Sequence, residues 1–78
     1  MYTNQIIIES LSDAKNFVNV MGKYNDLKIF LYSNHYKIDA HSIMGVISVD
    51  MSEPILLEVE DDNISDDFLQ DIKTFLVK

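Results

Sequence analysis

Hydrophobic residues change their spacing along the chain, and each spacing predicts a different element. The β-branched run at 5–9 favours a short buried strand. From Asp13 onward the apolar positions recur with the period of an α-helix, and Ser12 and Gly22 suit the N-cap and the end of that helix. The apolar face of the helix contains Ala14, Phe17, Val18 and Met21. The chain is therefore expected to begin with one strand and one amphipathic helix.

The middle of the chain alternates between apolar and polar residues, which is the period of a half-buried strand. One alternating run covers 27–32 and another covers 36–40, with a turn at 33–35 between them. Asn34 in this turn tolerates the left-handed backbone conformation that tight hairpins often require. We therefore expect an antiparallel hairpin here.

Two further helices and one further strand are predicted in the second half. Ser42 stands at the N-cap of a helix that is too short for more than about two turns. A loop at 50–54 ends in a proline, which cannot donate to a sheet and so suits the entry of a strand at 55–60. Ser65 then caps a last helix. The buried stripe of that helix is expected to be Phe68, Ile72, Phe75 and Leu76.

The predicted order of elements over residues 1–78 is β-α-β-β-α-β-α. Strands and helices of these lengths pack as an α+β domain of two layers, in which a four-stranded antiparallel sheet carries three helices on one face. The hydrophobic pattern leaves other split arrangements of the strands open. At 78 residues the chain is expected to form a single domain around one core.

Charge and composition narrow the class of partner. Thirteen Asp and Glu against six Lys give a formal net charge of −7, which disfavours nucleic acid and anionic membranes because both are bound through basic residues. The sequence has no cysteine, which excludes disulfides and Cys metal ligands. The N-terminus lacks the features of a signal peptide, and no apolar run approaches the length of a membrane span. We expect a cytoplasmic domain that neither binds nucleic acid nor inserts into a membrane.

One segment carries a family resemblance. Residues 38–48 read IDAHSIMGVIS, a strand that runs into a short helix opening with a serine followed by Ile-Met-Gly-Val. This segment resembles HPr, the histidine-containing phosphocarrier of the bacterial sugar phosphotransferase system. The similarity is good over residues 32–59 and extends to the flanking elements only in their order and apolar spacing. The resemblance implies the HPr-like fold, an open-faced β-sandwich with the order of elements given above.

The half of the family pattern that carries the phosphoryl group is missing. HPr proteins hold it on a histidine in a Gly-x-His-x-Arg-Pro-Ala-like segment before the first helix, whereas residues 8–15 read IESLSDAK here. The chain has no arginine, and Asp13 would place a negative charge where the resemblance implies a phosphate. We therefore predict a degenerate HPr-like domain that is not an enzyme and needs no cofactor. It is expected to be a regulatory or protein-interaction module related to the bacterial sugar phosphotransferase system, with a partner protein from the phosphotransferase or carbon-regulation network.

Two features of the resembling segment are candidate functional sites. Ser42 corresponds to the serine that a dedicated kinase phosphorylates in HPr proteins of many Gram-positive bacteria, although serine is also a common N-cap on structural grounds. Ile43, Met44 and Ile47 correspond to apolar side chains with which HPr docks onto partner proteins. We expect Met44 and Ile47 to be the exposed pair and Val46 to belong to the core.

Other classes of function remain as alternatives. A displaced phosphohistidine at His41 or His35 would make the chain a phosphocarrier. As structural residues, His35 is expected to be exposed in the turn, and His41 to be solvated beside the short helix. The two histidines with Asp39, and the acidic residues at 61–67, lack the spacing of known metal sites, so no metal is expected. The domain would alternatively serve as an interaction module in an unrelated process.

Overall fold

The structure is a computed structural model that describes residues 1–33, 35–61 and 63–76. Its elements are β1 (Tyr2–Ile6), α1 (Leu11–Met21), β2 (Ile29–Ser33), β3 (Tyr36–Asp39), α2 (Ile43–Ile47), β4 (Ile55–Val59) and α3 (Asp66–Ile72). Short 3₁₀ turns follow α1 at Gly22–Tyr24 and α3 at Lys73–Phe75. The order of elements is therefore the predicted β-α-β-β-α-β-α.

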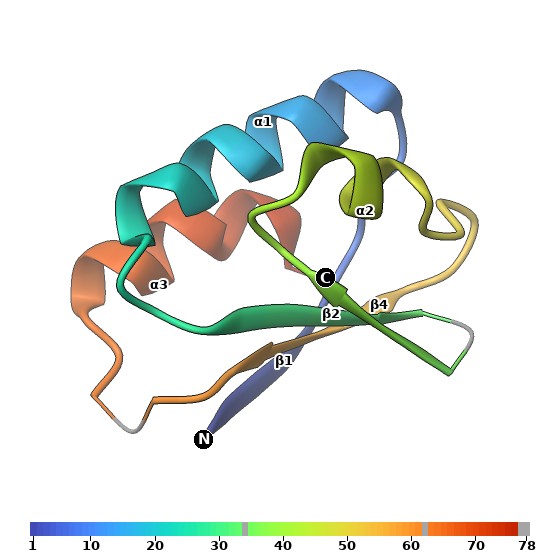
Figure 1. Cartoon of the computed structure of the whole chain (residues 1–78). Helices are drawn as coiled ribbons and strands as arrows, with labels where there is room; N and C mark the ends of the chain where they lie inside the picture. Colours follow the sequence, from blue (N-terminus) through green and yellow to red (C-terminus); the bar gives the residue numbers. More distant parts are fainter. Residues whose placement is uncertain (34, 62, 77–78) are drawn as a thin grey trace.

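The four strands form one antiparallel sheet in the order β1-β4-β2-β3. All three α-helices lie on one face of this sheet (Figure 1), which confirms the predicted two-layer α+β architecture. The last strand in the sequence, β4, lies inside the sheet between β1 and β2, so β1 and β3 form the two edges. A single bridge between Ile6 and Leu76 extends the edge at β1.

The hydrophobic core lies between the sheet and the helices. The last helix ends at Ile72, so Phe75 lies in the 3₁₀ turn that follows it and Leu76 lies beyond that turn. The residues predicted for the apolar faces of the first and last helices nevertheless all contact the core: Ala14, Phe17, Val18, Met21, Phe68, Ile72, Phe75 and Leu76. The sheet contributes buried side chains from its two inner strands: Ile29, Leu31, Ile55, Leu57 and Val59. The rings of Phe17 and Phe75 meet edge to face with their centroids 5.3 Å apart. Packing between the first and last helices therefore closes the core above the sheet.

The first strand differs from the prediction. It runs over Tyr2–Ile6 and not over 5–9, and it pairs with β4 along its whole length. Residues 3–5 are exposed, so the hydrophobic pattern gives little indication of this edge strand. The pattern indicates only where the chain enters the core. Beyond the strand, the N–H of Ile7 donates to the carbonyl of Phe75 at 2.7 Å.

α1 begins two residues earlier than predicted, because its N-cap is Ser10 and not Ser12. The Ser10 hydroxyl accepts a hydrogen bond from the N–H of Asp13 at 3.1 Å, and the Asp13 carboxylate accepts one from the N–H of Glu9 at 3.2 Å. Asp13 lies three residues after Ser10, and this spacing lets the two side chains each accept a hydrogen bond from a backbone N–H at the start of the helix. At the other end Gly22 is the C-cap, as predicted, and the chain continues from it in a 3₁₀ turn.

β2 and β3 form the predicted hairpin. Ser33 pairs with Tyr36, which leaves a turn of two residues. The predicted left-handed residue, Asn34, lies outside the described residues. Its neighbour His35 has a φ of 71°, a conformation that is uncommon for residues other than glycine.

The N-caps predicted for the other two helices are both present. Ser42 accepts a hydrogen bond from the N–H of Gly45, and Ser65 accepts one from the N–H of Phe68, each at 3.2 Å. With five residues, α2 has fewer than two turns, as predicted.

A carboxylate is buried on the face of the sheet that carries no helix. Glu58 on β4 is only 7% exposed, and its hydrogen bond with Tyr32 raises the pKa of that hydroxyl. On the same face, Lys37 lies 4.1 Å from the centre of the Phe30 ring and 3.4 Å from the carboxylate of Glu60. The alternation at 55–60 predicts that the Glu58 side chain points to this face, but it does not predict that this carboxylate is buried.

Candidate functional site

α2 carries the candidate docking residues, and β3 leads directly into it. The N–H of Ser42 donates to the carbonyl of Asp39 at 3.1 Å, and the carbonyl of Ser42 accepts from the N–H of Val46 at 2.9 Å. The Ser42 hydroxyl oxygen accepts from the N–H of Gly45. The backbone and the side chain of Ser42 are thus both used to begin this helix.

Gly45 allows α2 to lie close against β3. A Cβ atom at this position would be 2.7 Å from Cγ2 of Ile38 and 3.6 Å from the carbonyl oxygen of Asp39. The first distance is far inside the normal separation of two carbon atoms. Cγ2 of an isoleucine is bonded to its β-carbon, which has little rotational freedom, so the methyl group cannot easily move aside. Any larger residue in place of this glycine would therefore force the helix and the strand to move apart.

The exposed apolar pair of α2 is Ile43 and Met44, which corrects the prediction of Met44 and Ile47. Met44 is 71% exposed and Ile43 is 38% exposed, whereas Ile47 is half-buried against the core. Val46 is fully buried, as predicted. The two residues at the start of α2 are therefore exposed, whereas Val46 and Ile47 at its end contact the core.

The N-terminus of α1 is surrounded by negative charge. Asp13 lies in the first turn, and its carboxylate is hydrogen-bonded to the N–H of Glu9. A hollow of about 320 Å³ beside this helix end is lined by the same two acidic residues, together with Ile7 and the chain around Phe75. Two carboxylates at one helix end repel an anion by direct Coulomb interaction. This end of the helix is therefore poorly suited to hold a phosphoryl group.

His41 is half-buried, which corrects the prediction that it is solvated. Its Nδ1 lies 3.3 Å from the carboxylate of Asp39, and its Nε2 lies 3.3 Å from the carbonyl oxygen of Tyr24. Both ring nitrogens face oxygen acceptors, so attack on a phosphoryl group would require one of these contacts to break. His35 is exposed in the hairpin turn, as predicted.

The described residues do not gather metal ligands. Within 1–33, 35–61 and 63–76, no three His, Asp or Glu side chains are placed to hold an ion together. The carboxylate of Asp61 accepts a hydrogen bond from the N–H of Asn63 at 2.9 Å, while Asp62 lies outside the described residues. Asp66 and Asp67 lie in the first turn of α3, where negative charge is favourable.

One polar cluster has no signal in the sequence. The hydroxyl of Tyr24, in the turn after α1, donates to the carboxylate of Asp71 on α3, and Nζ of Lys23 lies 3.4 Å from the same oxygen. The hydrogen bond with Asp71, together with desolvation, raises the pKa of Tyr24 to about 12. The same hydrogen bond lowers the pKa of Asp71. The two residues are 47 positions apart, so no local pattern marks the pair.

The fold and this site define a class of protein: a two-layer α+β domain in which a short serine-capped helix presents two exposed apolar side chains. In comparisons with known proteins, no family model, curated protein or solved structure matches the chain. Over the part of the chain that the structure describes, no helix combines the length and the apolar character needed to cross a bilayer.

Proposed function

We propose that this chain is an HPr-like domain that acts without catalysis, as a protein-interaction module related to the bacterial sugar phosphotransferase system. The observation that carries the proposal is the exposure of Ile43 and Met44 on a short helix whose Val46 is buried in the core. An exposed methionine beside an exposed aliphatic side chain is typical of surfaces that adapt to a partner. The docking surface in this proposal consists of Ile43 and Met44, together with the half-buried Ile47.

The family part of the proposal is supported by the segment at 38–48. Its sequence resembles HPr, and it forms a strand, a serine-capped turn and a short helix, which are the local features that the resemblance implies. The element order and the four-stranded antiparallel sheet are compatible with the same fold.

The non-catalytic part is supported by the chemistry at the start of α1. The resemblance implies a histidine and an arginine beside this helix end, but Glu9 and Asp13 are found there. Hydrogen bonds to Ser10 and Asp13 also occupy two of the backbone N–H groups. A phosphate at this helix end would meet repulsion from the carboxylates and compete for the occupied donors.

Phosphorylation of Ser42 stays a prediction. Its hydroxyl oxygen caps α2 and is half-buried, so a kinase would have to open the cap to reach it. A phosphate there would add negative charge next to Ile43 and Met44 and would alter docking on this surface. Incubation with an HPr kinase and ATP, followed by intact mass measurement, tests the prediction; an unmodified chain would leave Ser42 as a cap only.

Binding and phosphotransfer measured on the same protein test the proposal. The full chain is titrated with the first enzyme of the phosphotransferase system, with HPr kinase and with a sugar permease, and it is separately incubated with the first enzyme and phosphoenolpyruvate. We expect binding to at least one of these proteins and no acid-labile phosphate on the chain. A phosphohistidine would instead identify a phosphocarrier that uses His41 or His35. If the chain binds none of the three proteins, the domain belongs to an unrelated process.

Substitutions of Met44 test the docking surface. Met44→Asp should weaken binding by about tenfold or more, because it places a charge at the centre of an apolar contact. The free energy of unfolding of this variant should differ from wild type by no more than about 0.5 kcal/mol, because Met44 is 71% exposed. Met44→Leu keeps the apolar surface and should bind normally, and Leu69→Asp on α3 controls for the added charge. Unchanged binding by Met44→Asp would exclude this surface.

A further inference from the structure

The ladder between β2 and β3 shows which backbone groups of β3 face outward. The N–H of Ala40 donates to the carbonyl of Ile29 at 3.0 Å. In an antiparallel pair, hydrogen-bonded residues alternate with residues whose N–H and C=O groups point away from the partner strand. From the register of the two strands, Lys37 and Asp39 are the residues that turn their backbone groups away from β2.

Within the described residues, no strand lies beside this outward edge of β3. β3 is the last strand of the sheet, and nothing in residues 1–33, 35–61 or 63–76 pairs with its outer side. The carbonyl of Asp39 is already bonded to the N–H of Ser42. The groups left for a further strand are the N–H and C=O of Lys37 and the N–H of Asp39.

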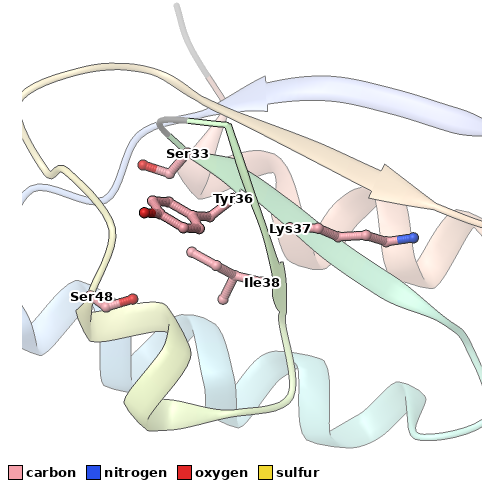
Figure 2. Close-up of a pocket in the computed structure, with 5 residues that line it drawn as sticks. All are labelled: Ser33, Tyr36, Lys37, Ile38 and Ser48. Carbon is pink, nitrogen blue, oxygen red and sulfur yellow. The ribbon is translucent and has the colours of Figure 1, made fainter.

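A cavity of about 400 Å³ adjoins the same edge, between β3 and the end of α2. It is lined by Ser33, Tyr36, Lys37, Ile38 and Ser48. Figure 2 shows the side chain of Lys37 pointing away from the other four, toward the opposite side of the strand. Lys37 therefore meets the cavity with its backbone. Tyr36 beside it is 71% exposed and is available for contact.

We propose that β3 and this cavity form a binding site for an extended peptide segment of a partner protein. The peptide pairs with the backbone of Lys37 and Asp39 as an added strand. Every second side chain of the peptide then points to the helix side of the sheet, because side chains alternate along a strand. One of them enters the cavity, where Tyr36 and Ile38 supply an apolar surface and two serines supply hydroxyl groups. This site is separate from the exposed residues of α2 and does not depend on the function proposed above.

Charge favours a peptide with basic residues around its apolar anchor. The chain has a formal net charge of −7, and the Asp39 side chain at one end of the edge is 61% exposed. Asp50 lies close to the cavity, because its N–H donates to the hydroxyl of Ser33 at 3.3 Å. The positive charge on β3, Lys37, is already paired with Glu60. The peptide is therefore expected to carry one large apolar residue flanked by Lys or Arg.

Selection from a displayed library of short random peptides, panned against the full chain, provides the probe. We expect the selected peptides to share a large apolar residue with basic flanks. In the ¹⁵N-labelled protein, the synthesised peptide should slow hydrogen exchange at the amides of Lys37 and Asp39. Selection of no peptide would overturn the site, and so would amide changes confined to Ile43–Ile47.

Two substitutions at one position separate the backbone contact from the side chain. Lys37→Pro removes an N–H that faces away from β2, so the hairpin should persist while peptide affinity falls about tenfold or more. Lys37→Ala loses the same side chain but keeps the N–H, and its affinity should stay within about threefold of wild type. Equal affinities of the two variants would overturn the proposal. If Lys37→Pro does not fold, Ser48→Phe tests the site by filling the cavity. Unchanged peptide affinity of Ser48→Phe would then overturn the proposal.

Two further measurements identify the occupant and separate this site from the α2 surface. Met44→Asp should bind the selected peptide normally, whatever it does to docking on α2. A second copy of this chain is the competing occupant of the edge. Sedimentation velocity that shows a dimer, abolished by Lys37→Pro and retained by Lys37→Ala, would assign the edge to self-association and overturn the peptide site.

Discussion

Substitution of Gly45 by alanine tests the packing of α2 on β3. The added Cβ would lie 2.7 Å from Cγ2 of Ile38, whereas two carbon atoms prefer about 3.5–4.0 Å. A shift of about 1 Å between helix and strand is therefore needed to accept the methyl group. Overpacking of this kind costs about 1–3 kcal/mol, and alanine recovers about 1 kcal/mol of it as the better helix former. Because the Ile38 methyl group cannot easily move aside, we expect a cost in the upper part of this range, about 2–3 kcal/mol, and therefore a net loss of about 1–2 kcal/mol in the free energy of unfolding.

Gly22 provides a matched control. A Cβ at this position meets nothing within 4 Å, and the φ of −60° suits alanine. Gly22→Ala should therefore stabilise the protein by about 0.4–1 kcal/mol, because it reduces the freedom of the unfolded chain. The same chemical change is thus expected to have opposite signs at the two glycines.

Urea denaturation at pH 7, followed by circular dichroism, measures both free energies. For a domain of this size, about 1 kcal/mol corresponds to a change in Tm of about 4–8 °C, so thermal scans give a second reading. Ile38→Ala removes the clashing methyl group, and in that background Gly45→Ala should no longer destabilise. The reasoning is refuted if Gly45→Ala alone is as stable as wild type, or if its cost persists when Ile38 is replaced.

Two other predictions concern the first helix and its contact with α3. Ser10→Ala should cost about 1 kcal/mol because it removes the N-cap of α1, whereas Ser12→Ala should be nearly neutral; the reverse result in urea denaturation would restore the cap that the sequence favours. Tyr24→Phe removes the hydrogen bond to Asp71. In the wild-type protein, folding raises the pKa of Tyr24 from 10.0 to about 12, so this hydrogen bond stabilises the protein fully below pH 10 and is lost as the pH rises toward 12. The lowered pKa of Asp71 makes the same bond fade in acid, as the pH falls through that lowered value. The difference in free energy of unfolding between wild type and Tyr24→Phe should therefore be greatest between about pH 4 and pH 10, and a difference that stays constant from pH 9 to pH 12 would contradict this account.

Local patterns in the sequence were enough to predict most of the elements. The apolar stripe of α1 follows from a spacing of three and four residues, and Ser42 and Ser65 each stand directly before a helical run. Such signals are local because a cap bonds an N–H only three residues away. At α1 the capping pattern fits two serines, Ser10 and Ser12. The structure has Ser10 as the N-cap, and the hydrogen bond from the N–H of Glu9 to the Asp13 carboxylate accompanies that cap.

The candidate sites were less predictable because exposure depends on distant contacts. The sequence places Ile43, Met44 and Ile47 on one short helix, but only the packing of α2 against the core shows that Ile47 is covered and Ile43 is exposed. The hydrogen bond between Tyr24 and Asp71 joins two elements that no local pattern connects.

By itself, the sequence determined the order of helices and strands and the buried faces of α1 and α3, because hydrophobic period and capping act over a few residues. It also placed a serine-capped short helix after the second strand of the hairpin. The tertiary structure decided that β4 lies inside the sheet and that β3 is left as an edge. It also brought a cavity to that edge, and it exposed Ile43 while covering Ile47. These features depend on pairings between residues far apart in the chain, and such pairings leave no periodic trace in the sequence.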